Sequence, residues 1–148
     1  MPPLDPIISG IARVIQLSIA PVFLLTAISS LLGVLTTRLG RVIDRARQLE
    51  DRLPLADAVE AEHLHHDIGQ LGARSKLVSL SISLSVAAAL LVCSIIAALF
   101  LGAEFNVHVE RVVAVCFVLA MCAIIAALLI FLREILVATR TLRFGPRP

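Results

Sequence analysis

One stretch of the 148-residue sequence gathers side chains that could bind a metal. Its acidic and histidine residues are Glu60, Glu62, His63, His65, His66 and Asp67. His63 with Asp67, and Glu62 with His66, have the i, i+4 spacing that puts two ligands on one helical face. The stretch lacks the H-E-x-x-H motif, and no fixed third ligand can be named. We therefore favour a solvated polar face over a metal site and assign no metal ligand. The sequence by itself does not decide whether His63, His65 and His66 bind a metal.

Catalytic chemistry has no support elsewhere in the sequence. The long apolar stretches contain no Lys for a Schiff base and no His beside a Ser or Cys for nucleophilic attack. The three cysteines, Cys93, Cys116 and Cys122, lie in apolar runs without C-x-x-C spacing, which indicates packing residues. We predict no catalytic residue, no cofactor and no enzymatic activity.

Polar residues recur at regular spacing along the first apolar stretch and the helical residues that follow it. They are separated by multiples of seven, which places them near one face of a helix: Gln16, Ser30, Thr37 and Asp44. Small residues at Ala27, Gly33 and Gly40 adjoin them and widen the set into a small, polar seam. Such a seam lines a water-facing ion path or lets two helices pack tightly, because small and hydroxyl residues allow backbones to approach closely.

A second polar group lies where the first and third apolar stretches end. Arg38, Arg41 and Arg45 share one helical face, and Glu134 continues a line of small residues that should point into the bundle. We expect Glu134 to form an ion pair with this arginine face, since an inward-facing carboxylate at a membrane edge needs a partner. The arginines could also bind anionic lipid head groups or line an anion-attracting vestibule.

The elements that position these residues are three apolar stretches, at residues 14–35, 77–101 and 112–132, none of which contains Asp, Glu, Lys, Arg or His. At a rise of about 1.5 Å per residue, roughly 20 helical residues cross the hydrocarbon core of a bilayer. Hydrophobic residues make up 59% of the chain, which is well above the share in soluble domains. The sequence therefore predicts an all-α membrane protein with three transmembrane helices in a single domain, residues 1–148.

Charge predicts the orientation of these helices. The 13 Lys and Arg residues lie almost entirely between the first and second stretches or after the third, and Arg13 and Arg111 are the exceptions. The positive-inside rule then places the N-terminus outside and the C-terminus in the cytoplasm. A net charge of +2 is too small to indicate binding of nucleic acid.

The connection at about residues 38–76 has a helical pattern of its own. Apolar residues recur at steps of three and four on both sides of Pro54: Leu39, Val42, Ala46, Leu49 and Leu53, then Ala61, Leu64, Ile68 and Leu71. Pro54 should end or turn the helix, because proline lacks the N–H that a helix interior requires. We predict a cytoplasmic antiparallel helical hairpin whose arms continue the first and second spans.

Three segments together resemble the bacterial membrane proteins grouped as domain of unknown function 2721. They are residues 15–26 (IQLSIAPVFLLT), 38–47 (RLGRVIDRAR) and 131–134 (FLRE), of which the second is the most specific. The resemblance implies a small multi-pass protein of the bacterial inner membrane. It implies no activity, substrate or catalytic residue.

Two functions remain in competition. The first is a homo-oligomeric channel or transporter for a small ion, built around the first helix, since three helices alone can barely enclose a pore. The second is a membrane scaffold or interaction protein whose basic hairpin binds anionic lipid or a partner protein.

Overall fold

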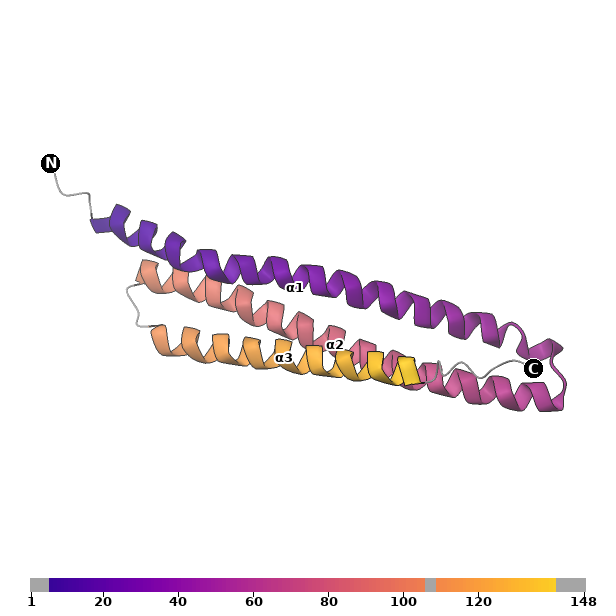
Figure 1. Cartoon of the computed structure of the whole chain (residues 1–148). Helices are drawn as coiled ribbons and strands as arrows, with labels where there is room; N and C mark the ends of the chain where they lie inside the picture. The colour runs from indigo at the N-terminus through magenta and orange to yellow at the C-terminus, as the bar shows by residue number, and fades with distance from the viewer. Residues whose placement is uncertain (1–5, 106–108, 141–148) are drawn as a thin grey trace. The chain divides into compact units, whose positions relative to one another are not determined.

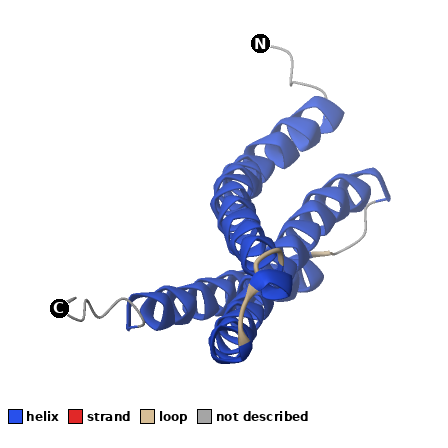
Figure 2. Ribbon diagram, turned by 90° about the vertical axis from the view of Figure 1, so that its right-hand side faces the viewer, coloured by secondary structure: helices blue, strands red, loops and turns tan. Residues whose placement is uncertain are grey.

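The computed structural model describes residues 6–105 and 109–140, and these residues form helices joined by short connections, with no strand among them (Figures 1 and 2). Helix α1 spans Pro6–Glu50, α2 spans Ala58–Phe105 and α3 spans Glu110–Arg140, while a short 3-10 helix, η1, spans Leu53–Leu55. All three α-helices are long and apolar enough to cross a membrane. The predicted all-helical architecture with three candidate spans is confirmed.

A tight turn around Pro54 joins α1 to α2. The α1 helix ends at Glu50, and the Arg52 amide donates to the Leu49 carbonyl as the chain leaves it. Pro54 lies in the first turn of η1, where its missing N–H removes no hydrogen bond. Asp57 precedes α2, with its carbonyl accepting from the Ala61 amide, and Asp is a preferred residue at this position. The turn at Pro54 and the continuous arms on either side of it match the predicted hairpin.

The chain divides into two compact units. The first comprises Met1–Leu31 with Leu84–Ile125, and the second comprises Leu32–Ser83 with Ala126–Pro148. The core of the first unit is made of small and branched side chains: Val14, Ser18, Ile28, Ser85, Ala88, Val92, Ile95 and Ala120. Each helix therefore contributes a narrow line of buried residues, and most of the large apolar side chains face outward, as in a helix bundle surrounded by lipid.

The second unit contains the hairpin together with Arg38, Arg74 and Glu134. Its α1 core residues are Leu35, Val42 and Leu49, spaced by seven, and they continue the spacing of Val14 and Ile28 in the first unit. Its α2 core residues are Leu64, Val78 and Ser81, and its α3 core residues are Ala127 and Glu134. A repeat of seven keeps one face of a helix against its neighbours over a long distance.

Candidate functional site

Charged side chains from three helices meet at one buried carboxylate in the second unit. Glu134 of α3 is 0% exposed. Arg74 of α2 donates to its Oε1 from both Nε (3.2 Å) and Nη2 (2.9 Å). Arg38 of α1 brings Nη1 to 3.5 Å from Oε2. We call Arg38, Arg74 and Glu134 the ion-pair cluster; it joins α1, α2 and α3.

The two arginines of the ion-pair cluster hold the carboxylate unequally. Among the described residues, Oε2 of Glu134 has no hydrogen-bond partner, because Arg38 Nη1 lies beyond the usual N–H···O distance. The Arg74 side chain is 23% exposed and that of Arg38 is 39% exposed, so water screens the Arg38 contact more strongly. Arg38 also lies over the Phe131 ring, with Cζ 5.8 Å from the ring centroid, which is a cation–π distance. Arg74 is therefore the principal partner of Glu134.

The three arginines expected near Glu134 have different positions. Arg38 lies at the carboxylate, whereas Arg41 and Arg45 are exposed, and Arg45 Nη1 lies 3.4 Å from Gln48 Oε1. Arg74 was not among the residues that the sequence pattern placed near Glu134. A signal was present, since Arg74 precedes Val78 by four residues and Ser81 by seven, on the buried side of α2.

A serine joins α2 to α3 one heptad away from the ion-pair cluster. Ser81 is completely buried, and its Oγ donates to the Ala127 carbonyl at 3.0 Å. Ser83, two residues later, is exposed and donates to the Ser79 carbonyl of its own helix. The serines of α2 thus have different roles, and Ser81 provides a hydrogen bond between helices.

The polar seam of α1 is exposed along its length. Gln16 and Ser30 in the first unit are exposed, and so are Thr37 and Asp44 in the second. Each follows a position of the buried heptad by two residues, as Ser30 follows Ile28. Two residues turn an α-helix by about 200°, so the seam lies nearly opposite the face that packs within the chain.

The hydroxyl groups of the seam are bonded within α1 itself. Ser30 Oγ donates to the Thr26 carbonyl at 3.1 Å, and Thr37 Oγ1 donates to the Gly33 carbonyl at 2.8 Å. A Cβ atom added at Gly33 or Gly40 would meet nothing within 4 Å. The seam therefore presents hydroxyl lone pairs at Ser30 and Thr37 and open space beside Gly33 and Gly40.

The histidine-rich stretch lies in the first turns of α2. His63, His65 and His66 are exposed, and His66 Nε2 lies 2.9 Å from Gln70 Nε2. Within residues 6–105 and 109–140, His, Cys, Asp and Glu side chains do not gather in groups of three suited to a metal ion.

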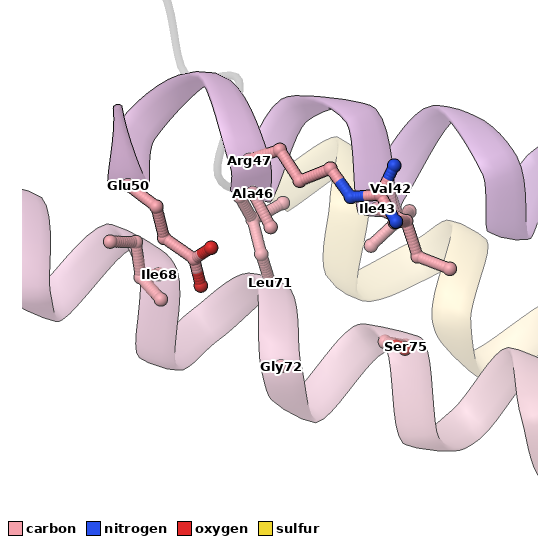
Figure 3. Close-up of a pocket in the computed structure, with 9 residues that line it drawn as sticks. All are labelled: Val42, Ile43, Ala46, Arg47, Glu50, Ile68, Leu71, Gly72 and Ser75. Atoms are coloured by element: carbon pink, nitrogen blue, oxygen red, sulfur yellow. The ribbon is translucent and has the colours of Figure 1, made fainter. Parts of the chain in front are cut away.

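An open cavity of about 270 Å³ lies between the hairpin arms (Figure 3). Its lining is mostly aliphatic, with one polar and two charged side chains: Val42, Ile43, Ala46, Arg47, Glu50, Ile68, Leu71, Gly72 and Ser75. Glu50 extends from α1 toward α2 near Ile68.

A family model described as "Protein of unknown function (DUF2721)" matches residues 18–144, which is most of the chain and includes the whole ion-pair cluster. No curated protein and no solved structure matches the chain. These comparisons assign no role to any residue of the ion-pair cluster.

Proposed function

The chain belongs to the family of proteins of unknown function DUF2721, and we propose that it is a non-enzymatic, homo-oligomeric protein of the bacterial inner membrane that carries a small ion. In this proposal α1 of each copy packs beside α1 of neighbouring copies. The observation that carries the proposal is the exposure of Gln16, Ser30, Thr37 and Asp44 on the side of α1 opposite its buried heptad.

A lipid environment makes such a face costly unless something covers it. Lipid tails cannot form hydrogen bonds with the Gln16 amide, and small residues such as Gly33 leave gaps that flexible tails fill poorly. A second α1 helix can approach closely at Gly33 and Gly40, where the chain itself leaves open space. Association through α1 therefore satisfies polar groups and improves packing at the same time.

The chemistry of the seam favours a cation over an anion. Ser30 and Thr37 donate their hydroxyl hydrogens to α1 carbonyls, so their remaining lone pairs point away from the chain's own bonds. Asp44 adds a carboxylate to the same line of residues. Oxygen lone pairs and carboxylates are the groups that hard cations prefer. Several copies arranged around this face would form an oxygen-lined path.

The substitution Gly33→Leu tests the assembly. Because Gly33 has open space around it, leucine should fit within one chain and should still separate two α1 helices. We expect the native mass in detergent to fall toward the monomer while the thermal midpoint of unfolding stays unchanged. Ala87→Leu, which adds similar bulk to an exposed position of α2, is the matched control and should leave the mass unchanged.

Ion transport is tested separately in proteoliposomes. Wild-type protein should support the flux of a monovalent cation, and Gly33→Leu should abolish it. Assembly without flux under any cation gradient would refute transport and leave the oligomer as a structural module. A monomeric wild-type protein would refute the proposal as a whole.

Lipid binding by the exposed arginines Arg41 and Arg45 is the second candidate function. Arg41 and Arg45 are exposed just beyond the first apolar stretch, while Arg38 is engaged with Glu134. Each basic residue near an anionic membrane surface contributes about 1 kcal/mol of binding. In nanodiscs, Arg41→Gln with Arg45→Gln should reduce enrichment of anionic lipid around the protein without changing ion flux. An unchanged lipid composition would refute this function.

The proposed topology has the N-terminus outside and the hairpin and C-terminus in the cytoplasm, as the distribution of Lys and Arg favours. With all three native cysteines replaced by alanine, Glu110→Cys should react with an impermeant maleimide added to intact cells. Asp57→Cys, in the connection between α1 and α2, should react only after the cells are opened. The reverse pattern would invert the topology.

A further inference from the structure

The open cavity between the hairpin arms faces away from α3. On α2, Gly72 lines the cavity and is turned about 160° around the helix from Arg74, which holds Glu134 of α3. On α1, Arg47 lines the cavity and is turned about 180° from Arg38, the second arginine near Glu134. The pair of hairpin arms is therefore covered by α3 on one side and open on the other.

Small side chains make room for the cavity. Ala46 of α1 and Gly72 and Ser75 of α2 line it, and a Cβ atom added at Gly72 would meet nothing within 4 Å. Ile68 and Leu71 beside them are only half-buried, so an apolar ligand would cover aliphatic surface that now contacts water. The volume of about 270 Å³ is close to the lower end of the range for small-molecule sites, about 300 Å³.

Two charges of opposite sign line the cavity without pairing with each other. Arg47 and Glu50 are three residues apart on α1, a spacing at which opposite charges on a helix can meet. In the part of the chain that the structure describes, the ion pairs are those of Glu134, so both side chains are available to a ligand. Figure 3 shows Arg47 extending toward Val42 and Glu50 extending toward Ile68. The cavity thus has a cationic end and an anionic end.

The separation of these ends determines the length of a ligand that could contact both. From Ile68 to Ser75 the cavity follows seven residues of α2, which is about 10 Å. An α-amino acid carries its ammonium and carboxylate groups on one carbon atom and is too short. A linear chain of roughly eight carbon atoms with one charged group at each end spans this distance.

We propose that the cavity binds a linear aliphatic zwitterion, a small molecule with a carboxylate at one end and a primary ammonium group at the other. The Arg47 guanidinium donates hydrogen bonds to the carboxylate, and the Glu50 carboxylate accepts them from the ammonium group. The methylene chain lies on Ile68 and Leu71. The α1 seam contributes no residue to the cavity lining, so this binding does not rest on ion transport or on assembly through α1.

The probe for this site is ω-aminooctanoic acid, titrated against the full chain in nanodiscs by saturation-transfer NMR, with empty nanodiscs as the background. Two capped forms each lack one charge: the amide lacks the carboxylate, and the N-acetyl form lacks the ammonium group. We expect the probe to bind with a Kd of about 1 mM and each capped form to bind about tenfold more weakly. Equal binding of the three compounds, or no saturable binding of the probe, would overturn the proposal.

Two glycines of α2 provide a matched test of the location. Gly72→Leu should fill the cavity and abolish binding of the probe, because leucine has open space to enter there. Gly69→Leu adds the same bulk at a glycine that also has open space but does not line the cavity, and it should bind the probe like wild type. Both variants should keep the thermal midpoint of unfolding, which separates loss of binding from loss of fold. Equal binding by the two variants would overturn the proposed site.

The capped forms also test the role of each charge. Arg47→Gln should weaken binding of the probe about tenfold and leave binding of the amide unchanged, since the amide has no carboxylate to lose. Glu50→Gln should weaken the probe similarly and leave the N-acetyl form unchanged. Arg52→Gln and Asp51→Asn, at exposed positions outside the cavity lining, are the controls. An Arg47→Gln effect of equal size on all three compounds would contradict the assigned contacts.

A second copy of the chain is the alternative occupant of the cavity. In the chain with its native cysteines replaced by alanine, Gly72→Cys should remain a free thiol under mild oxidation, because the proposed occupant is a small molecule. A predominant disulfide between two copies would overturn the proposal and identify this side of the hairpin as a contact between copies.

Discussion

The ion-pair cluster and the polar seam of α1 both consist of polar side chains, but these lie in opposite surroundings. At the cluster, Arg74 of α2 and Arg38 of α1 approach the buried Glu134 carboxylate, so the chain itself supplies the opposite charge. Along the seam, Ser30, Thr37 and Asp44 are exposed and lie away from the chain's own helices. The first region should therefore control the stability of a single chain, whereas the second should control what surrounds it. Substitutions can separate these roles.

The largest expected effect on stability is at Glu134. Glu134→Gln leaves Arg74 without its carboxylate in a mostly buried site, which typically costs about 3 to 5 kcal/mol. Arg74→Gln should destabilise the protein comparably, and the double substitution should cost clearly less than the sum of the two. Thermal midpoints in one detergent provide the measurement. Glu110→Gln, at an exposed site in the first turn of α3, is the control, and strict additivity at Glu134 and Arg74 would contradict the pairing.

A smaller effect is expected at Arg38. Its side chain is 39% exposed and its contact with Oε2 is long, so Arg38→Gln should cost about 1 kcal/mol or less. Part of this cost comes from the Phe131 ring, and Phe131→Leu should therefore couple to Arg38→Gln in a double-mutant cycle. A loss equal to that of Arg74→Gln would show that the two arginines share the carboxylate equally.

Ser81 is the next position in order of expected effect. Ser81→Ala removes the hydrogen bond to the Ala127 carbonyl, and such bonds between membrane helices average about 0.6 kcal/mol. Ser83→Ala should have almost no effect, because the Ser83 hydroxyl bonds within its own helix. Equal thermal midpoints for the two variants would contradict a structural role for Ser81 between α2 and α3.

The smallest effect on stability is expected in the seam. Ser30→Leu removes only a bond to the carbonyl of Thr26 in the same helix, so the thermal midpoint of a single chain should hardly change. The native mass should nevertheless fall, because a bulky residue separates two α1 helices. Lower stability at constant mass would show that this face packs within the chain, and no change in either quantity would show that it faces lipid.

Much of the fold followed from local patterns. Apolar stretches without charge predicted three long helices, and Pro54 between two helical patterns predicted the turn from α1 to α2. Both patterns reflect rules that act within a short segment: backbone groups in lipid must bond within their own helix, and proline interrupts that bonding. The family resemblance was likewise contained in the sequence, and the match over residues 18–144 confirmed it.

Local sequence patterns did not identify which arginines contact Glu134. Spacing placed Arg38, Arg41 and Arg45 on one helical face, but a face spans a wide arc, and the rotation of α1 against α3 decides which of the three is near. Arg74 was counted among the charges that orient the protein and was not considered as a partner. Arg74 and Glu134 are 60 residues apart in the sequence, so spacing within one helix could not predict this contact between α2 and α3.

By itself, the sequence determined which segments are helical, where α1 turns into α2, and that polar residues recur every seven positions along α1. Only the tertiary structure decided that Arg74 holds Glu134, that Ser81 bonds to Ala127, and that the α1 seam lies opposite the buried heptad. The reason is that helix formation and apolar length are properties of one segment. The side of a helix that becomes buried depends on how neighbouring helices rotate and align against it.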